Sequence, residues 1–356
     1  MRFGLILILG ALATRFACAQ PPSEPSTDRW KKVFQTEVQE RRRPVYALAF
    51  SPDGTLLAGF VSGDPEKDPG GLIQVWDATT GKERPVTAAQ RPRSKYSGVQ
   101  SLIYSPAGNL FATGAEFGND RPMLFWEVSS GKELPAIKGS YFSIIKVAFS
   151  PDSKLIGIYG VRQFADPMEC RVRVFEASSK KELFDLPWDR YAVPFVCFLP
   201  DSKTLVVPGP KGVLKLLDVS TGKERGQSPA IDGHMFALAL KGKAVLAGTG
   251  SGTIGLFDLD TGKRRPTFEL DSKWRLRALS ADGMVLVVVG MERQGREVTL
   301  MIKRWNLDAG KAAGLFRTDI DSDLIYSIAL SPDGDKLAVG CGEHLSVWVR
   351  EKAKAE

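Results

Sequence analysis

The stretch Val45–Gly54 (VYALAFSPDG), continued by Val75–Glu83 (VWDATTGKE), decides the fold of this chain. It reads as an apolar strand, a Ser-Pro-Asp-Gly turn, two further strands and a Thr-Gly-Lys turn. Related units recur seven times along the 356 residues, at a spacing of about 40 to 50 residues. A repeat of that length, built from short strands, predicts a radial array of small β-sheets and one domain.

The turns between the first and second strands of the units share a simple chemistry. Proline presets φ, aspartate caps its own backbone, and glycine takes the left-handed position. The seven turns are Ser51–Gly54, Ser105–Gly108, Ser150–Ser153, Leu199–Ser202, Leu240–Lys243, Ser280–Gly283 and Ser331–Gly334. The third strands end at Trp76, Trp126, Phe175, Leu217, Phe257, Trp305 and Trp348. We expect these large side chains to fill the space between neighbouring sheets, so both sets of residues are structural.

The fixed order of the Ser-Pro-Asp-Gly, Trp-Asp and Thr-Gly-Lys motifs resembles the WD-repeat β-propeller family over roughly residues 30–350. The copies are degenerate, because the family's Gly-His dipeptide is present only as Gly233-His234. Its usual Asp before the third strand is missing in most units, so quinoprotein-like propellers remain possible relatives. The resemblance implies an all-β fold: a seven-bladed β-propeller of four-stranded antiparallel blades.

The last repeat ends after its third strand, whereas a strand-like segment precedes the first repeat. Residues 30–38 alternate between apolar and polar positions, as a strand does. We therefore predict that this segment joins the last blade and closes the ring, which removes the exposed sheet edges.

The N-terminus is typical of a secretory signal. Arg2 precedes the ten apolar residues Gly4–Ala13, and Ala17-Cys18-Ala19 is a small-x-small cleavage site. The predicted layout is a signal peptide at 1–19, a linker at 20–29, the propeller at 30–350 and a charged tail at 351–356. The mature chain is expected to be periplasmic or extracellular without a membrane span. Anchoring as a lipoprotein through Cys18 is the alternative.

Charge and cysteine content bound the possible partners. Cleavage after Ala19 removes Arg2 and Arg15, which lowers the formal net charge from +7 to +5. Nucleic acid is not an expected partner, since the chain is predicted to be exported and its charge is spread thinly. The mature chain keeps Cys170, Cys197 and Cys341, so at least one thiol is unpaired. A Cys170–Cys197 bridge between neighbouring repeats is left open.

The sequence shows no catalytic constellation and no zinc-binding pattern, so we predict no catalytic residue, no metal and no cofactor. The motif Gly250–Gly255 (GSGTIG) precedes a strand rather than a helix, which indicates a hairpin turn. Asp319–Asp323 resembles the start of a calcium loop, but the closing Glu position is Leu330. Weak calcium binding there is left open. The alternative to a non-enzyme is a lactonase-like hydrolase or a quinoprotein-like oxidoreductase with a central-channel site.

The insertions between second and third strands fall at Ser62–Gly71, Ala115–Met123, Gly160–Cys170 and Gly290–Thr299. The resemblance implies that they open on one face, together with the inter-blade loop Thr87–Gly98. Aromatic and basic residues, which are enriched in binding hot spots, gather in the loops of this face. They are Lys95, Tyr96, Phe117, Arg121, Tyr141, Phe142, Arg162, Phe164, Trp188, Arg190, Tyr191, Trp274, Arg275 and Arg293. We predict an exported, monomeric, non-catalytic scaffold that binds a protein or peptide, or a glycan, through this face.

Overall fold

A computed structural model describes the chain in nineteen ranges. They are residues 29–37, 44–64, 68–84, 93–94, 99–115, 122–137, 143–162, 169–189, 195–230, 244–248, 253–261, 263, 268–269, 274–279, 285–294, 297–306, 311–321, 325–342 and 344–351. The predicted signal peptide lies outside them, as does almost all of the predicted linker and tail.

The described chain is all-β apart from one short 3₁₀ turn, η1 (Pro210–Gly212). The first sheet contains β2 (Val45–Phe50), β3 (Leu56–Asp64), β4 (Asp68–Asp77) and β5 (Arg93–Ser94). The second contains β6 (Val99–Tyr104), β7 (Leu110–Ala115), β8 (Met123–Glu127) and β9 (Glu133–Ile137). The third contains β10 (Ser143–Phe149), β11 (Leu155–Arg162), β12 (Glu169–Glu176) and β13 (Glu182–Trp188).

The fourth sheet contains β14 (Cys197–Phe198), β15 (Thr204–Pro208), β16 (Leu214–Asp218) and β17 (Glu224–Gln227). The fifth contains β18 (Ala244–Gly248), β19 (Thr253–Asp258) and β20 (Phe268–Glu269), and its predicted turn Leu240–Lys243 lies outside the described residues. The sixth contains β21 (Trp274–Leu279), β22 (Val285–Gln294), β23 (Glu297–Asn306) and β24 (Lys311–Asp321). The seventh contains β25 (Ile325–Leu330), β26 (Lys336–Cys341), β27 (His344–Arg350) and β1 (Trp30–Glu37).

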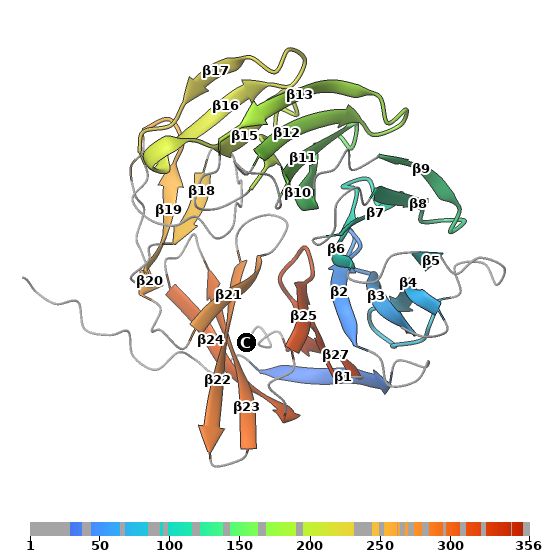
Figure 1. The fold of residues 1–356 in the computed structure, drawn as a ribbon. Helices are drawn as coiled ribbons and strands as arrows, with labels where there is room; N and C mark the ends of the chain where they lie inside the picture. Colours follow the sequence, from blue (N-terminus) through green and yellow to red (C-terminus); the bar gives the residue numbers. More distant parts are fainter. Residues whose placement is uncertain are drawn as a thin grey trace, which may run out of the picture.

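Each described sheet is antiparallel, and Figure 1 shows the sheets side by side around a common centre. Buried apolar clusters join the sixth sheet to the seventh, the seventh to the first, and each following pair up to the fourth and fifth. All seven large residues at the third-strand ends are buried, as predicted, with exposed fractions of at most 6%. These side chains therefore contribute to the packing between sheets.

The turns after the first strands form a continuous row at one end of five sheets. Gly54 lies beside Pro332 of the seventh sheet, and Gly108 lies beside Pro52 of the first. The Ala107 amide donates to Ser153 Oγ at 2.8 Å, and the Asp152 amide donates to Ser202 Oγ at 3.2 Å. We call the five turns Ser331–Gly334, Ser51–Gly54, Ser105–Gly108, Ser150–Ser153 and Leu199–Ser202 the turn row. Because these five turns adjoin one another, their five sheets have the same orientation, with the turn after the first strand at the same end of each sheet.

Serine replaces the usual glycine at two positions of the turn row. Ser153 and Ser202 have φ values of 61° and 55°, where Gly54 has 67°. A non-glycine residue pays a steric cost in this left-handed region. Each serine hydroxyl accepts a hydrogen bond from the turn of the preceding sheet, which offsets part of that cost and ties neighbouring sheets together.

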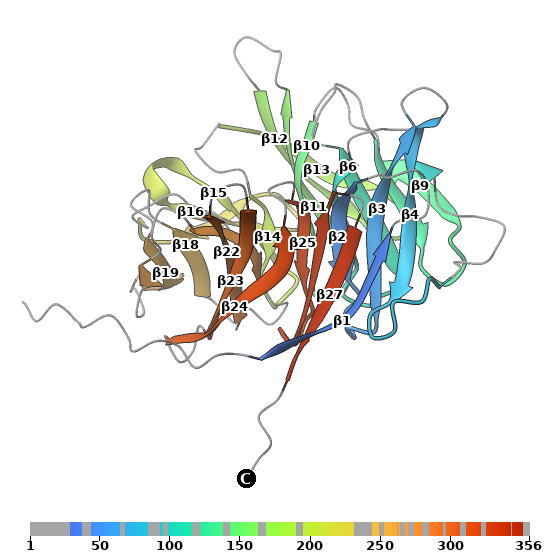
Figure 2. The same cartoon turned by 90° about the horizontal axis from the view of Figure 1, so that it is seen from below.

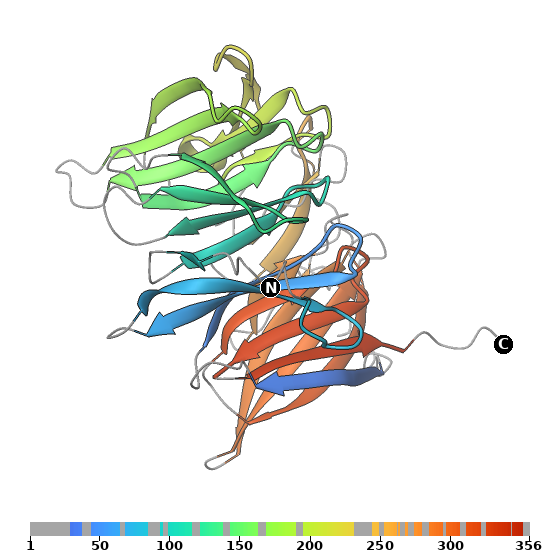
Figure 3. The same ribbon diagram turned by 90° about the vertical axis from the view of Figure 1, so that its right-hand side faces the viewer.

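The seventh sheet combines strands from distant parts of the sequence. β1 pairs antiparallel with β27, from Trp30 opposite Arg350 to Glu37 opposite His344. In Figure 3 the blue β1 lies along the edge of the red sheet. Val33 and Phe34 pack against the cluster shared by the first and seventh sheets. The predicted strand at 30–38 is thus formed over Trp30–Glu37 and belongs to the last sheet.

Candidate binding surface at the hairpin end

The ends of these five sheets opposite the turn row carry the hairpins between second and third strands, and we call this the hairpin end. Figure 2 shows β2, β6, β10 and β25 from the side. Much of the predicted insertion sequence is paired strand rather than loop. β3 and β4 continue to Asp64 opposite Asp68, and β11 and β12 to Arg162 opposite Glu169. In the sixth sheet the pairing runs to Gln294 opposite Glu297. Extended pairing satisfies backbone groups that a loop would leave to water.

Two tyrosines meet at the hairpin end of the first and seventh sheets. The rings of Tyr46 (β2) and Tyr326 (β25) lie 5.2 Å apart between centroids at an interplanar angle of 78°, an edge-to-face contact. Tyr326 is 38% exposed and is the one large hydrophobic side chain among the described residues that reaches this level. From the sequence alone we did not predict that these tyrosines form part of a binding surface. Their equivalent positions could have indicated it, because both tyrosines lie five residues before the turn-row serines Ser51 and Ser331.

Two of the predicted binding residues have described side chains. Arg162 lies at the end of β11 with Nη1 3.7 Å from Glu169 Oε2, and both side chains are about half exposed. An exposed pair at this distance contributes little stability and leaves the guanidinium available to a partner. Trp188 is half-buried and contacts the fourth sheet instead: its Nε1 donates to the Pro208 carbonyl at 2.7 Å, and Lys215 Nζ lies 5.5 Å from its ring centroid. Trp188 therefore fastens the third sheet to the fourth.

The remaining predicted binding residues divide into two groups. Trp274 and Arg275 lie in β21 and Arg293 in β22, and the structure places only their backbone. The others lie outside the described residues: Lys95, Tyr96, Phe117, Arg121, Tyr141, Phe142, Phe164, Arg190 and Tyr191. The structure thus brings Arg162 to the hairpin end and adds the Tyr46–Tyr326 pair there.

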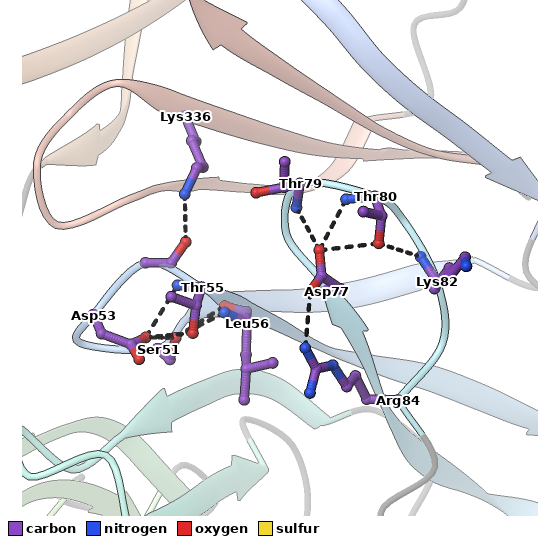
Figure 4. A network of polar contacts seen from close by, with 11 residues as sticks. Ser51, Asp53, Thr55, Leu56, Asp77, Thr79, Thr80, Lys82, Arg84 and Lys336 are labelled. Atoms are coloured by element: carbon purple, nitrogen blue, oxygen red, sulfur yellow. Dashed lines mark hydrogen bonds and ion pairs between the residues drawn. The ribbon is translucent and has the colours of Figure 1, made fainter.

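Carboxylates with clearly shifted pKa values lie in the turns, away from the hairpin end. Asp77 Oδ1 accepts hydrogen bonds from the amides of Thr80 at 2.9 Å and Thr79 at 3.1 Å, and Arg84 Nη2 donates to Asp77 Oδ2 at 3.1 Å (Figure 4). These contacts, led by the Thr80 amide, hold the pKa of Asp77 far below its ordinary value. Ser51 Oγ likewise donates to Asp53 Oδ1 and lowers the pKa of Asp53. The shifts come from turn capping, so they do not mark an acid–base site.

The capped aspartates predict how stability depends on pH. A hydroxyl hydrogen bond from Ser220 is the main cause that lowers the pKa of Asp218 from 3.8 to about 2. Because the folded-state pKa is depressed, the stabilisation is present above pH 3.8 and is lost as pH falls towards 2. We expect the free energy of unfolding, measured by denaturant titration, to be level from pH 7 to about 4 and then to fall. Ser220→Ala should raise the pKa of Asp218 in a carboxyl NMR titration. An unchanged pKa would contradict this assignment.

The described thiols are all free. Cys170 lies in the cluster between the third and fourth sheets, whereas Cys197 packs towards the fifth sheet. The two thiols face different junctions, so the Cys170–Cys197 bridge that the sequence left open is not formed. Burial raises the pKa of the Cys197 thiol well above its ordinary value, which keeps it protonated.

The described part of the chain offers no group of three or more His, Cys, Asp or Glu side chains that could hold a metal ion. His344 is half-buried at the hairpin end, and its Nδ1 has no hydrogen-bond partner among those residues. Asp319 and Asp321 lie in β24, while Ser322 and Asp323 of the possible calcium loop are outside the described residues. No helix in the described residues is long and apolar enough to cross a membrane.

Comparison with known proteins bears on the repeat itself. The family model for the WD domain, G-beta repeat, matches residues 33–77, which span most of β1 and the first three strands of the first sheet. Residues 33–77 therefore contain a WD40 repeat. "Protein tipD" of Dictyostelium discoideum is 33% identical over 72 residues, which cover 20% of this chain and 11% of that protein. The resemblance inferred from the sequence motifs is confirmed.

WD40 domains are generally non-catalytic scaffolds, and they commonly bind proteins. The hairpin end presents an exposed tyrosine and a weakly paired arginine, whereas the carboxylates with shifted pKa values are used to cap turns.

Proposed function

We propose that this protein is an exported scaffold: a closed seven-bladed WD40 propeller that binds a protein partner at its hairpin end. The observation that carries the proposal is the exposed Tyr326, held edge-to-face by Tyr46. Tyrosine and arginine supply much of the binding energy in protein interfaces, because each combines a large contact area with a polar group. Arg162 presents the second of these residue types at the same end.

Closure of the ring is the finer part of the fold proposal. The described clusters support it by joining consecutive sheets from the sixth, through the seventh and first, to the fifth. Contact between the fifth and sixth sheets would complete seven blades. Residues 1–19 would act as the signal peptide and residues 20–29 as a linker to β1, with the mature protein monomeric in the periplasm or outside the cell.

Site-specific photo-crosslinking tests the binding surface. A photoreactive residue is placed at Tyr326, and in a matched control at Lys82, which is exposed in a turn at the other end of the first sheet. We expect one discrete protein adduct from position 326 in intact cells and none from position 82. Adding Arg162→Glu should weaken the adduct, because the partner loses the guanidinium contact.

The same experiment separates the alternatives. Equal adducts from both positions would contradict a specific hairpin-end surface. Absence of any protein adduct from position 326, with a correctly folded and exported protein, would overturn protein binding and favour a glycan or a small ligand. Detection of the unprocessed chain in the cytoplasm would overturn the export part alone.

A further inference from the structure

The seventh sheet cannot be completed from one part of the chain. The third and fourth sheets are each built from consecutive strands, β10–β13 and β14–β17. The seventh sheet instead has the order β1-β27-β26-β25, so its outer strand precedes the other three by nearly the whole chain. Its completion requires a long-range pairing, whereas the third and fourth sheets require hairpins only.

The apolar face of the first sheet is also completed from the far part of the sequence. Val45, Leu57 and Trp76 of the first sheet share one buried cluster with Leu345 and Val347 of β27. Leu57, Leu345 and Val347 are each 0% exposed. Until residues near 345 are present, this face of the first sheet has no partner, although the sheet itself is made of early residues.

Two polar contacts bridge the same junction. Ser327 Oγ donates to the Val45 carbonyl at 2.6 Å, and Lys336 Nζ donates to the Gly54 carbonyl at 2.7 Å (Figure 4). Both contacts join residues 282 positions apart. They lie at opposite ends of the inner strands, because Val45 begins β2 and Gly54 belongs to the turn row. The junction is therefore bridged at both of its ends.

We propose that pairing of the first and seventh sheets is the rate-limiting step of folding, so that folding waits until the chain up to Arg350 is available. Closing a long loop costs conformational entropy before its contacts form, and folding rates fall as contacts become less local. In this order the sheets built from consecutive strands form early, and pairing of the first and seventh sheets then stabilises the whole domain. For a chain exported N-terminus first, as in the proposed function, this order delays folding until the whole propeller sequence has crossed the membrane.

Refolding kinetics of the full mature chain test the proposal, and Leu345→Ala and Leu205→Ala are a matched pair. Both leucines are 0% exposed, but Leu205 packs between the third and fourth sheets, which are close in sequence. We expect Leu345→Ala to slow refolding at least tenfold with little change in unfolding rate. Leu205→Ala should change refolding less than threefold and accelerate unfolding. Brief unfolding before each jump keeps the prolyl bonds in their native isomers.

The reverse pattern, in which Leu345→Ala leaves the refolding rate unchanged and accelerates unfolding, would overturn the proposal. If Leu345→Ala does not fold, Ser327→Ala probes the same junction with a smaller change, and its effect should again fall on the refolding rate. These rates are measured in vitro, so failure of the kinetic proposal is distinguishable from failure of export or of partner binding.

Discussion

A mature chain lacking residues 20–43 should lose most of its stability, because β1 would be absent from the seventh sheet. Trp30 stacks on Phe316 with ring centroids 6.0 Å apart, and Phe316 contacts Trp348 at 5.9 Å. Val33 and Phe34 pack against the first-to-seventh cluster. Burying such side chains contributes about 1.5–3 kcal/mol each when burial is complete. We expect a loss on the order of 5 kcal/mol, comparable with the total stability of many domains.

Thermal unfolding of the truncated chain beside a chain lacking only residues 20–28 measures this effect. The shorter deletion ends before Arg29, whose carbonyl accepts a hydrogen bond from the Glu351 amide, so its melting temperature should match that of the mature protein. The longer deletion also exposes the edge of β27, and we expect it to aggregate on heating. Equal melting temperatures for both deletions would show that β1 does not hold the seventh sheet.

The substitution Trp76→Ala should cost about 3–5 kcal/mol of unfolding free energy. Trp76 is the penultimate residue of β4 and is 2% exposed between the first and seventh sheets. Its ring lies so close to Gly59 that a Cβ there would stand 2.8 Å from the ring. Removing the indole leaves a cavity beside Gly59, because the backbone there already packs directly against the ring.

Urea unfolding at equilibrium measures this cost, and Trp76→Phe is the matched control. Phenylalanine keeps an aromatic ring in the junction, so its cost should be about 1–2 kcal/mol. A loss below 1 kcal/mol for Trp76→Ala would mean that the junction repacks around the missing ring. In that case the third-strand aromatics would not be the main contacts between sheets.

The repeating elements could be predicted because their causes are local. The turn Ser51–Gly54 forms from its own residues: Ser51 Oγ donates to Asp53 Oδ1, and Gly54 takes a φ of 67°. The residues at third-strand ends are large in every repeat, and burial follows from their position in the sheet. The strand at 30–38 could also be placed, since the last repeat had three strands and needed a fourth.

The candidate site was less predictable, because it depends on residues that meet only in the folded chain. Tyr46 and Tyr326 come from the first and seventh sheets, and each reads alone as an ordinary strand residue. Trp188 looked like an exposed loop aromatic, but its indole N–H reaches the Pro208 carbonyl of the next sheet. The described ends of the predicted loop Gly160–Cys170 and most of the predicted loop Gly290–Thr299 are continuations of their hairpins.

The sequence by itself determined the repeat, its turns, the antiparallel sheets and the strand that the last sheet borrows. Turn capping and strand alternation act over a few residues, so they can be read along the chain. Only the tertiary structure decided that Tyr326 is exposed beside Tyr46, that Trp188 contacts the fourth sheet, and that Cys170 and Cys197 face different junctions. Those outcomes depend on which sheets pack together. Packing joins residues that are far apart in the sequence, so no local sequence pattern indicates their contacts.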